Sequence, residues 1–141
     1  MRQRFGLEKS FSIMAPSSWV DGTENNFSIN APNDGPSLNG TTYRVSHRPP
    51  LKEFSDARFQ GVMEMGMYKQ VGNERPLTNE GGVVREYEGI WPGDKFVTYY
   101  VVACLNAVET YATVAIVTTK KDWGKNRVLY EKMLSTFEVY P

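Results

Sequence analysis

The chain is 141 residues long, and its 16 Lys and Arg residues balance its 16 Asp and Glu residues. That length predicts one domain, residues 1–141, which buries about two thirds of the unfolded chain's surface without a disulfide or a metal ion. Because phosphate binding depends on an excess of Lys and Arg, the balanced charge argues against a nucleic-acid partner and against a polybasic membrane-binding surface.

The single cysteine, Cys104, excludes a disulfide within the chain and favours a reducing compartment. Residues 1–10 lack the apolar stretch of a signal peptide. The longest apolar stretch, Phe96 to Leu105, is much shorter than the ~20 residues of a membrane-spanning helix. We therefore expect a cytoplasmic protein without membrane insertion.

The first third of the chain predicts β-structure. Alternating apolar residues indicate strands at Phe11–Ala15 and Asn26–Ala31, and β-prone residues indicate another at Thr41–Ser46. The turn-forming run Pro32–Pro36 separates the second and third strands, which we expect to form a hairpin.

A helix is expected from Leu51 to about Met67, because Phe59, Val62, Met63 and Gly66 recur at helical spacing. Pro50 is suited to the first position of that helix, where its missing N–H group costs nothing.

The second half of the chain predicts four strands and a final helix. Gly72 and Pro76 interrupt the segment from Tyr68 to Thr78, which we interpret as a weak or bulged edge strand. The strands that follow are Val83–Trp91, Phe96–Leu105 and Thr110–Thr119, the first two joined by a tight turn at Pro92–Lys95.

For the last helix, Asp122 is a candidate N-cap, and the apolar face comprises Leu129, Tyr130, Met133, Leu134 and Phe137. Because helices do not alternate with strands one by one, we expect an α+β fold: a single antiparallel, curved sheet with two helices packed mainly on one face.

Residues suited to catalysis or metal binding are few. The only histidine, His47, has no cysteine or histidine cluster near it in the sequence, so we expect no metal site and no cofactor. Burial among apolar neighbours would make Cys104 inert. Glu86 and Glu88 share one face of a strand and could act with His47 as an acid–base group, although exposed carboxylates are more often simply solvated.

Surplus apolar residues are the unusual feature of the sequence. Both faces of Phe96–Leu105 are apolar, so one face, with Tyr99 and Val101, either belongs to the core or meets a partner or a second copy of the chain. Met63, Met65 and Met67 surround the end of the first helix and cannot all face one core. We expect these two groups of residues to bind an apolar segment of another protein.

Several segments follow one another in a distinctive order: Phe11–Trp19 with its Pro-x-x-Trp turn, Tyr43–Ser46, Phe54–Arg58, Gly81–Tyr87 and Lys121–Trp123. This layout resembles the PsbP/DcrB-type α+β fold over nearly the whole chain. Within that group, the Eag-type chaperones of type VI secretion effectors are similar in length. This resemblance implies a bacterial homodimer that holds an apolar effector or toxin segment on the sheet, lined here by Phe27, Ile29, Tyr99 and Val101.

Because one fold serves many functions, other functions stay open. An immunity protein that neutralises a toxin by direct binding fits the same composition. A carrier of a small apolar ligand and an enzyme that uses Glu86, Glu88 and His47 are further alternatives.

Overall fold

The computed structural model describes residues 3–7, 11–15, 20–21, 27–32, 35–44, 50–77, 81–106, 110–136 and 138–139. The elements in chain order are β1 (Gln3–Leu7), β2 (Phe11–Ala15), β3 (Val20–Asp21), β4 (Phe27–Asn30), β5 (Ser37–Arg44), α1 (Leu51–Glu64), β6 (Tyr68–Leu77), β7 (Gly82–Gly89), β8 (Thr98–Asn106), β9 (Thr110–Thr119), α2 (Lys120–Ser135) and β10 (Glu138–Val139).

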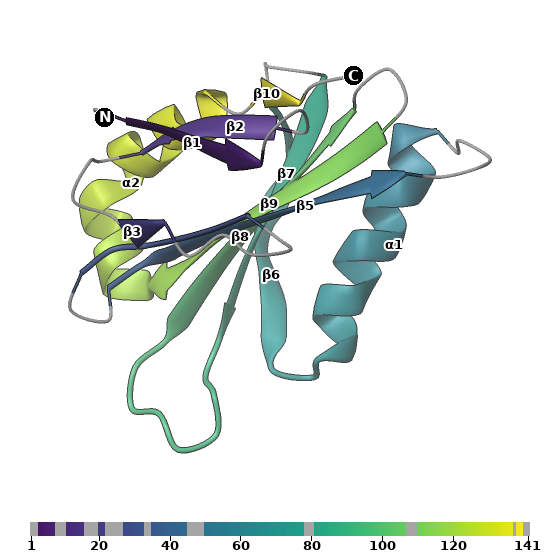
Figure 1. The fold of residues 1–141 in the computed structure, drawn as a ribbon. Coiled ribbons are helices and arrows are strands. Elements are labelled where there is room, and N and C mark those ends of the chain that lie inside the picture. Colours follow the sequence, from purple (N-terminus) through teal and green to yellow (C-terminus); the bar gives the residue numbers. More distant parts are fainter. Residues whose placement is uncertain are drawn as a thin grey trace.

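The main sheet is antiparallel, in the order β3-β4-β5-β9-β8-β7-β6 (Figure 1). A smaller sheet has the order β1-β2-β10. This architecture confirms the α+β class and the antiparallel pairing. The hairpin predicted in the first third of the chain is β4 with β5, in which Ile29 is opposite Leu38.

The interrupted segment after the first helix is indeed a bulged edge strand. β6 lies at the end of the main sheet, and its register with β7 shifts between Val71 and Arg75. Gly72, with a φ of 70°, stands inside this irregularity, where glycine adopts a backbone angle that other residues rarely take. A bulge protects an exposed sheet edge from pairing with another chain.

The two helices lie on opposite faces of the main sheet, which corrects the expectation that both pack mainly on one face (Figure 1). Helix α2 buries Trp123 and Met133 against the β8 face that carries Tyr99 and Val101. Helix α1 buries residues of its own, including Phe59, with the other face of β8. Because side chains alternate along a strand, a central strand covered on both faces is apolar throughout.

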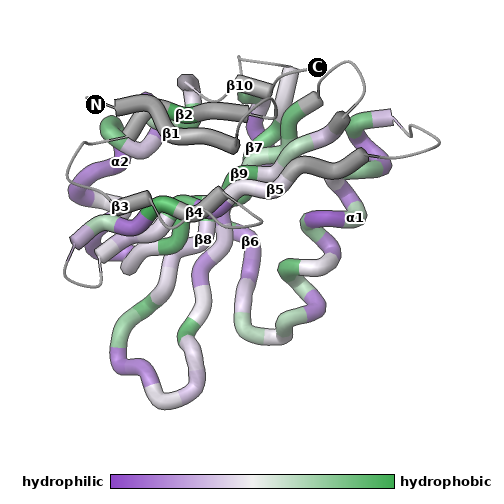
Figure 2. Tube along the Cα trace, viewed as in Figure 1, coloured by the Kyte–Doolittle hydropathy of each residue, from purple (hydrophilic) through white to green (hydrophobic). Residues whose placement is uncertain are grey.

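The small sheet contributes to the core on the α2 side of the main sheet. Ile13 of β2 is fully buried in the same core cluster as Trp123 and Leu134 of α2. β10, which follows α2, pairs with β2. The apolar residues on both faces of β8 are therefore buried within one chain. The hydrophobic residues gather on the central strands (Figure 2).

The N-cap of helix α2 lies three residues before the candidate N-cap Asp122. Its N-cap is Thr119, whose hydroxyl accepts a 3.1 Å hydrogen bond from the backbone N–H of Asp122. Asp122 thus occupies the first turn, where a carboxylate stabilises the positive end of the helix dipole.

Candidate functional site

The sheet residues predicted to bind a partner are mostly in the core. Ile29 and Val101 are fully buried and Tyr99 is 4% exposed, so the expectation of an open sheet face at these positions is wrong. The physical reason is α2, whose Trp123 ring stacks on Tyr99 at a centroid distance of 5.2 Å. Phe27 pairs with Gly40 through its backbone, and its side chain lies outside the described residues.

The methionines at the end of α1 have a different environment. Met63 is 44% exposed and Met65 is 48% exposed, whereas Met67 is partly buried against the core cluster of α1. Gly66 has a φ of 77° and lets the chain leave the helix here toward β6. Two of the three methionines are therefore available on the surface.

Glu86 is held in an ion-pair network beneath α2. Its Oε1 accepts a 2.6 Å hydrogen bond from the Tyr99 hydroxyl, and its Oε2 lies 3.3 Å from guanidinium nitrogens of both Arg75 and Arg127. Arg75 also forms a bidentate ion pair with Glu131 of α2. These contacts attach α2 to the sheet, which is a structural role for Glu86.

Glu88 is ion-paired as well. Its carboxylate lies 2.8 Å from Nζ of Lys120 and 3.3 Å from Nζ of Lys69. The hydrogen bond from Lys120, supported by that from Lys69, lowers the pKa of Glu88. A carboxylate whose pKa is lowered is a poor general acid, so this geometry does not favour the acid–base alternative. His47, the third member of that group, lies outside the described residues.

Cys104 is fully buried on the α1 face of β8. Burial raises the pKa of its thiol to about 12. The thiol is therefore neutral and unreactive in the folded chain, in agreement with the sequence prediction.

The loop between β7 and β8 exposes apolar side chains, among them Ile90 and Phe96, and contains a tight turn. Trp91, Pro92, Gly93 and Asp94 form a turn in which Asp94 N donates a 3.0 Å hydrogen bond to the Trp91 carbonyl oxygen. Proline at the second position and glycine at the third, here with a φ of 87°, are typical of a type II turn. This confirms the turn predicted at Pro92–Lys95.

Most of the exposed large hydrophobic side chains of the described residues lie at one end of the main sheet. We call this group the hairpin-end surface; it comprises Met63, Met65, Ile90, Trp91 and Phe96. Its residues belong to the end of α1 and to the β7–β8 loop, and pairing of Tyr68 with Gly89 places these two segments at the same end of the sheet (Figure 1). Ile90 is 58% exposed and Phe96 is 52% exposed.

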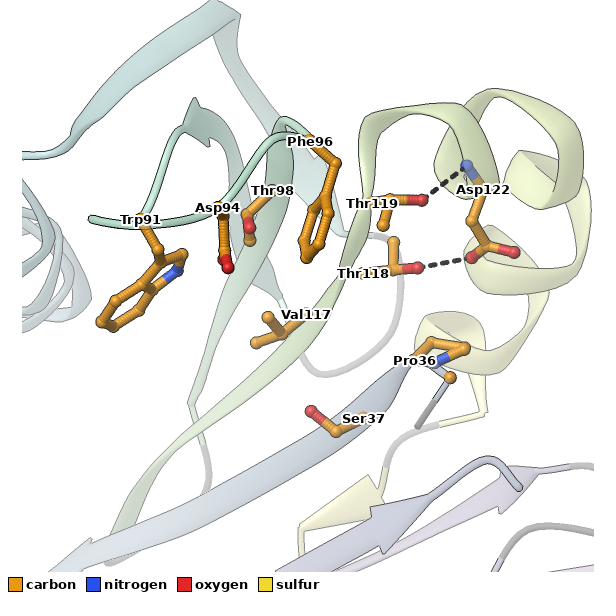
Figure 3. Close-up of a pocket in the computed structure, with 11 residues that line it drawn as sticks. Pro36, Ser37, Trp91, Asp94, Phe96, Thr98, Val117, Thr118, Thr119 and Asp122 are labelled. Atoms are coloured by element: carbon orange, nitrogen blue, oxygen red, sulfur yellow. Dashed lines mark hydrogen bonds between the residues drawn. The ribbon is translucent and has the colours of Figure 1, made fainter. Parts of the chain in front are cut away.

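A pocket of about 470 Å³ adjoins this surface. The residues that line it are Gly35, Pro36, Ser37, Trp91, Asp94, Phe96, Thr98, Val117, Thr118, Thr119 and Asp122. In Figure 3, side chains of the β7–β8 loop lie on one side of the pocket, and side chains around the start of α2 lie on another. Pro36 and Ser37 belong to the third wall. No signal in the sequence indicated this site, because its walls are far apart along the chain.

The wall formed by α2 is fixed by hydrogen bonds. The carboxylate of Asp122 accepts hydrogen bonds from the Thr118 hydroxyl at 2.5 Å, from Nδ2 of Asn126 at 2.9 Å and from the Tyr130 hydroxyl. The backbone N–H of Lys120 donates a 2.8 Å bond to the carbonyl oxygen of Val97, which joins this wall to the loop. The wall formed by α2 is therefore held in place by side-chain hydrogen bonds and joined to the loop wall.

The described residues include no group of three or more His, Cys, Asp or Glu side chains placed to hold a metal ion. In the same part of the chain, no helix is long and apolar enough to cross a membrane.

Comparison with known proteins identifies the fold. No family profile and no curated protein sequence matches the chain. Among solved structures, the cyanobacterial PsbP of Synechocystis superposes with a TM-score of 0.73 at 14% identity, over 98% of this chain and 92% of that one. The chain has a PsbP/Mog1-like fold.

Two further structures support that assignment. The Ran-binding protein Mog1p of Saccharomyces cerevisiae has a TM-score of 0.68 at 12% identity, over 97% of this chain and 94% of that one. LpqN of Mycobacterium tuberculosis, involved in cell envelope biogenesis, has a TM-score of 0.68 at 9% identity, over 99% and 90%. The TM-scores establish the shared fold, but at identities this low the function has to be argued from the site.

Proposed function

We propose that this chain is a non-enzymatic protein-binding module that contacts its partner through the hairpin-end surface. The observation that carries the proposal is the concentration of exposed Met63, Met65, Ile90, Trp91 and Phe96 at one end of the sheet. The only other exposed large hydrophobic residue in the described ranges is Val128 of α2. Grouped exposed apolar residues, with aromatic and Met side chains, are typical of binding surfaces.

Two further observations support a binding role. The carboxylates that could have served catalysis, Glu86 and Glu88, are engaged with cations of α2 and neighbouring strands. One protein of the same fold, Mog1p, is described as Ran-binding. For this chain we propose a cytoplasmic role as the cognate chaperone of a bacterial secreted effector or toxin, with an immunity protein as the second candidate.

The proposed surface is tested by matched baits. The wild-type chain, the Ile90→Ser/Phe96→Ser variant and the control Val128→Ser are tagged and purified gently from the cells that naturally contain the protein. We expect one stoichiometric partner with the wild type and the control, and at least about tenfold less with the double variant, since a few central apolar residues dominate such interfaces. Equal recovery with all three baits would contradict the proposal.

Co-expression separates the two finer roles. A chaperone raises the soluble yield of its partner, whereas an immunity protein abolishes the partner's toxicity without changing its yield. An unchanged yield together with unchanged toxicity would exclude both roles for that partner.

A further inference from the structure

We propose that the pocket beside the β7–β8 loop receives a lysine or arginine side chain of the protein partner. This inference rests on the proposed function, since it names the chemistry with which the binding surface selects its partner. The described residues lining the pocket include two carboxylates, Asp94 and Asp122, and no Lys, Arg or His. The charge of the pocket is thus negative in a chain whose total charge is zero.

An anionic occupant is disfavoured by the start of α2. A helix N-terminus usually attracts anions because its first N–H groups are unpaired. Here Thr119 caps the helix, and the carboxylate of Asp122 lies in its first turn. The neighbouring Lys120 ammonium is directed to Glu88, 2.8 Å away, and does not line the pocket.

The two carboxylates differ in what they can still bind. Asp122 already accepts hydrogen bonds from Thr118, Asn126 and Tyr130, so it supplies a fixed negative charge. The Asp94 side chain is exposed and has no hydrogen bond or ion pair with other described side chains. Asp94 is therefore the group that can form a direct ion pair with an incoming cation.

The rest of the lining suits a side chain that is apolar along its length and charged at its tip. The Trp91 and Phe96 rings can contact the methylene groups of a Lys or Arg side chain and attract its cation through their π faces (Figure 3). The hydroxyls of Ser37, Thr98 and Thr119 can accept hydrogen bonds from an ammonium or guanidinium group. Binding pockets of about 300–1,000 Å³ are common, and this one falls in that range at about 470 Å³.

The occupant is assigned to a protein, and not to a free amine, because the pocket is continuous with the hairpin-end surface. Trp91 and Phe96 belong to both. A partner that covers Ile90 and Phe96 with apolar residues would have to place a residue next to the pocket. A basic residue there would gain charge complementarity at the rim of an otherwise apolar contact.

The test uses the full chain labelled with ¹⁵N and three probes: N-acetyl-lysine amide, N-acetyl-arginine amide and the uncharged N-acetyl-norleucine amide. We expect the cationic probes to shift the Trp91 indole N–H signal and the Thr98, Thr118 and Thr119 amide signals. Norleucine should shift them much less at the same concentration. Asp94→Asn should weaken binding of the cationic probes about two- to fivefold, as expected for a solvent-exposed ion pair, whereas Glu53→Gln on α1 should not.

Equal shifts from norleucine, or shifts that Asp94→Asn leaves unchanged, would overturn the cation site. n-Butylamine is included to identify the source of the cation: binding tighter than that of N-acetyl-lysine amide would favour a free amine and overturn the assignment to a protein. In the bait experiment, loss of the partner with Ile90→Ser/Phe96→Ser but full retention with Asp94→Asn would overturn this inference alone. Retention with every variant would instead overturn the proposed function.

Discussion

The indole Nε1 of Trp91 donates a 3.0 Å hydrogen bond to the Tyr68 hydroxyl, and the two rings meet edge to face with centroids 6.3 Å apart. Tyr68 begins β6 directly after the Met-rich end of α1, and its ring stacks on Tyr100 of β8. The bond therefore attaches the β7–β8 loop to the sheet at the point where the hairpin-end surface meets the core. A binding surface held in place loses less entropy when the partner binds.

Removing this bond should loosen the loop. We expect Tyr68→Phe to lower the free energy of unfolding by about 0.5–1.5 kcal/mol, because a partly buried hydrogen bond is lost while the ring packing remains. Trp91→Phe should have a similar effect, and the double variant should cost less than the sum of the two. Denaturant unfolding of all four proteins measures this coupling, and strictly additive effects would show that the bond contributes nothing.

Gly89 should not tolerate a side chain. A Cβ atom at this position would lie 2.3 Å from the Met67 carbonyl oxygen, which is backbone and cannot move aside easily. We expect Gly89→Ala to destabilise the chain by about 1–3 kcal/mol. The control is Gly61→Ala on α1, where nothing lies within 4 Å, and it should stabilise the helix by about 0.5–1 kcal/mol. Chemical denaturation checks both, and equal effects would contradict the packing described.

Tyr99 should matter for stability and not for the partner. Tyr99→Phe removes the donor of the 2.6 Å bond to Glu86 and leaves that carboxylate with Arg75 and Arg127. A buried hydrogen bond to a charged group contributes about 1.5–3 kcal/mol, and we expect a loss of that order. Partner capture should be unchanged. Weaker capture by a variant of unchanged stability would show that the sheet face does bind the partner.

Glu88 should make stability depend on pH. Its pKa in the folded chain is lowered, chiefly by Lys120, so its ion pairs stabilise the fold above the ordinary pKa of a glutamate. That contribution is lost as the pH falls through the lowered pKa. Because both lysines are largely exposed, we expect Glu88→Gln to cost up to about 1 kcal/mol near neutral pH. Denaturation curves recorded across the acid range should converge for the two proteins, and a constant difference would contradict this role.

Local signals in the sequence predicted much of the fold. The Pro92–Gly93 pair predicted the turn, and Gly72 and Pro76 predicted the irregular edge strand. The helical spacing predicted the buried Phe59 and Val62 of α1. It was wrong for Met63, which is 44% exposed, and for the helix end, because α1 stops at Glu64, before Gly66. Each of these signals depends on residues near one another in the chain, where backbone preferences act directly.

The placement of α2 and the pocket could not be predicted in the same way. The alternation along β8 shows that Tyr99 and Val102 face opposite sides, but not which helix covers which side. A strand that is apolar on both faces can be a buried central strand or can present one face to a partner. The pocket brings Pro36, Phe96 and Asp122 together from three distant segments, and none of them carries a motif of its own.

The most direct test of the binding surface is site-specific photo-crosslinking in the cells that naturally contain the protein. A benzophenone amino acid replaces Phe96 in one variant and Val128 in another, since both positions are exposed and apolar but only Phe96 belongs to the hairpin-end surface. We expect one discrete crosslinked protein from position 96 and none from position 128. The same crosslinked protein from both positions, or from position 128 alone, would contradict binding through the hairpin-end surface.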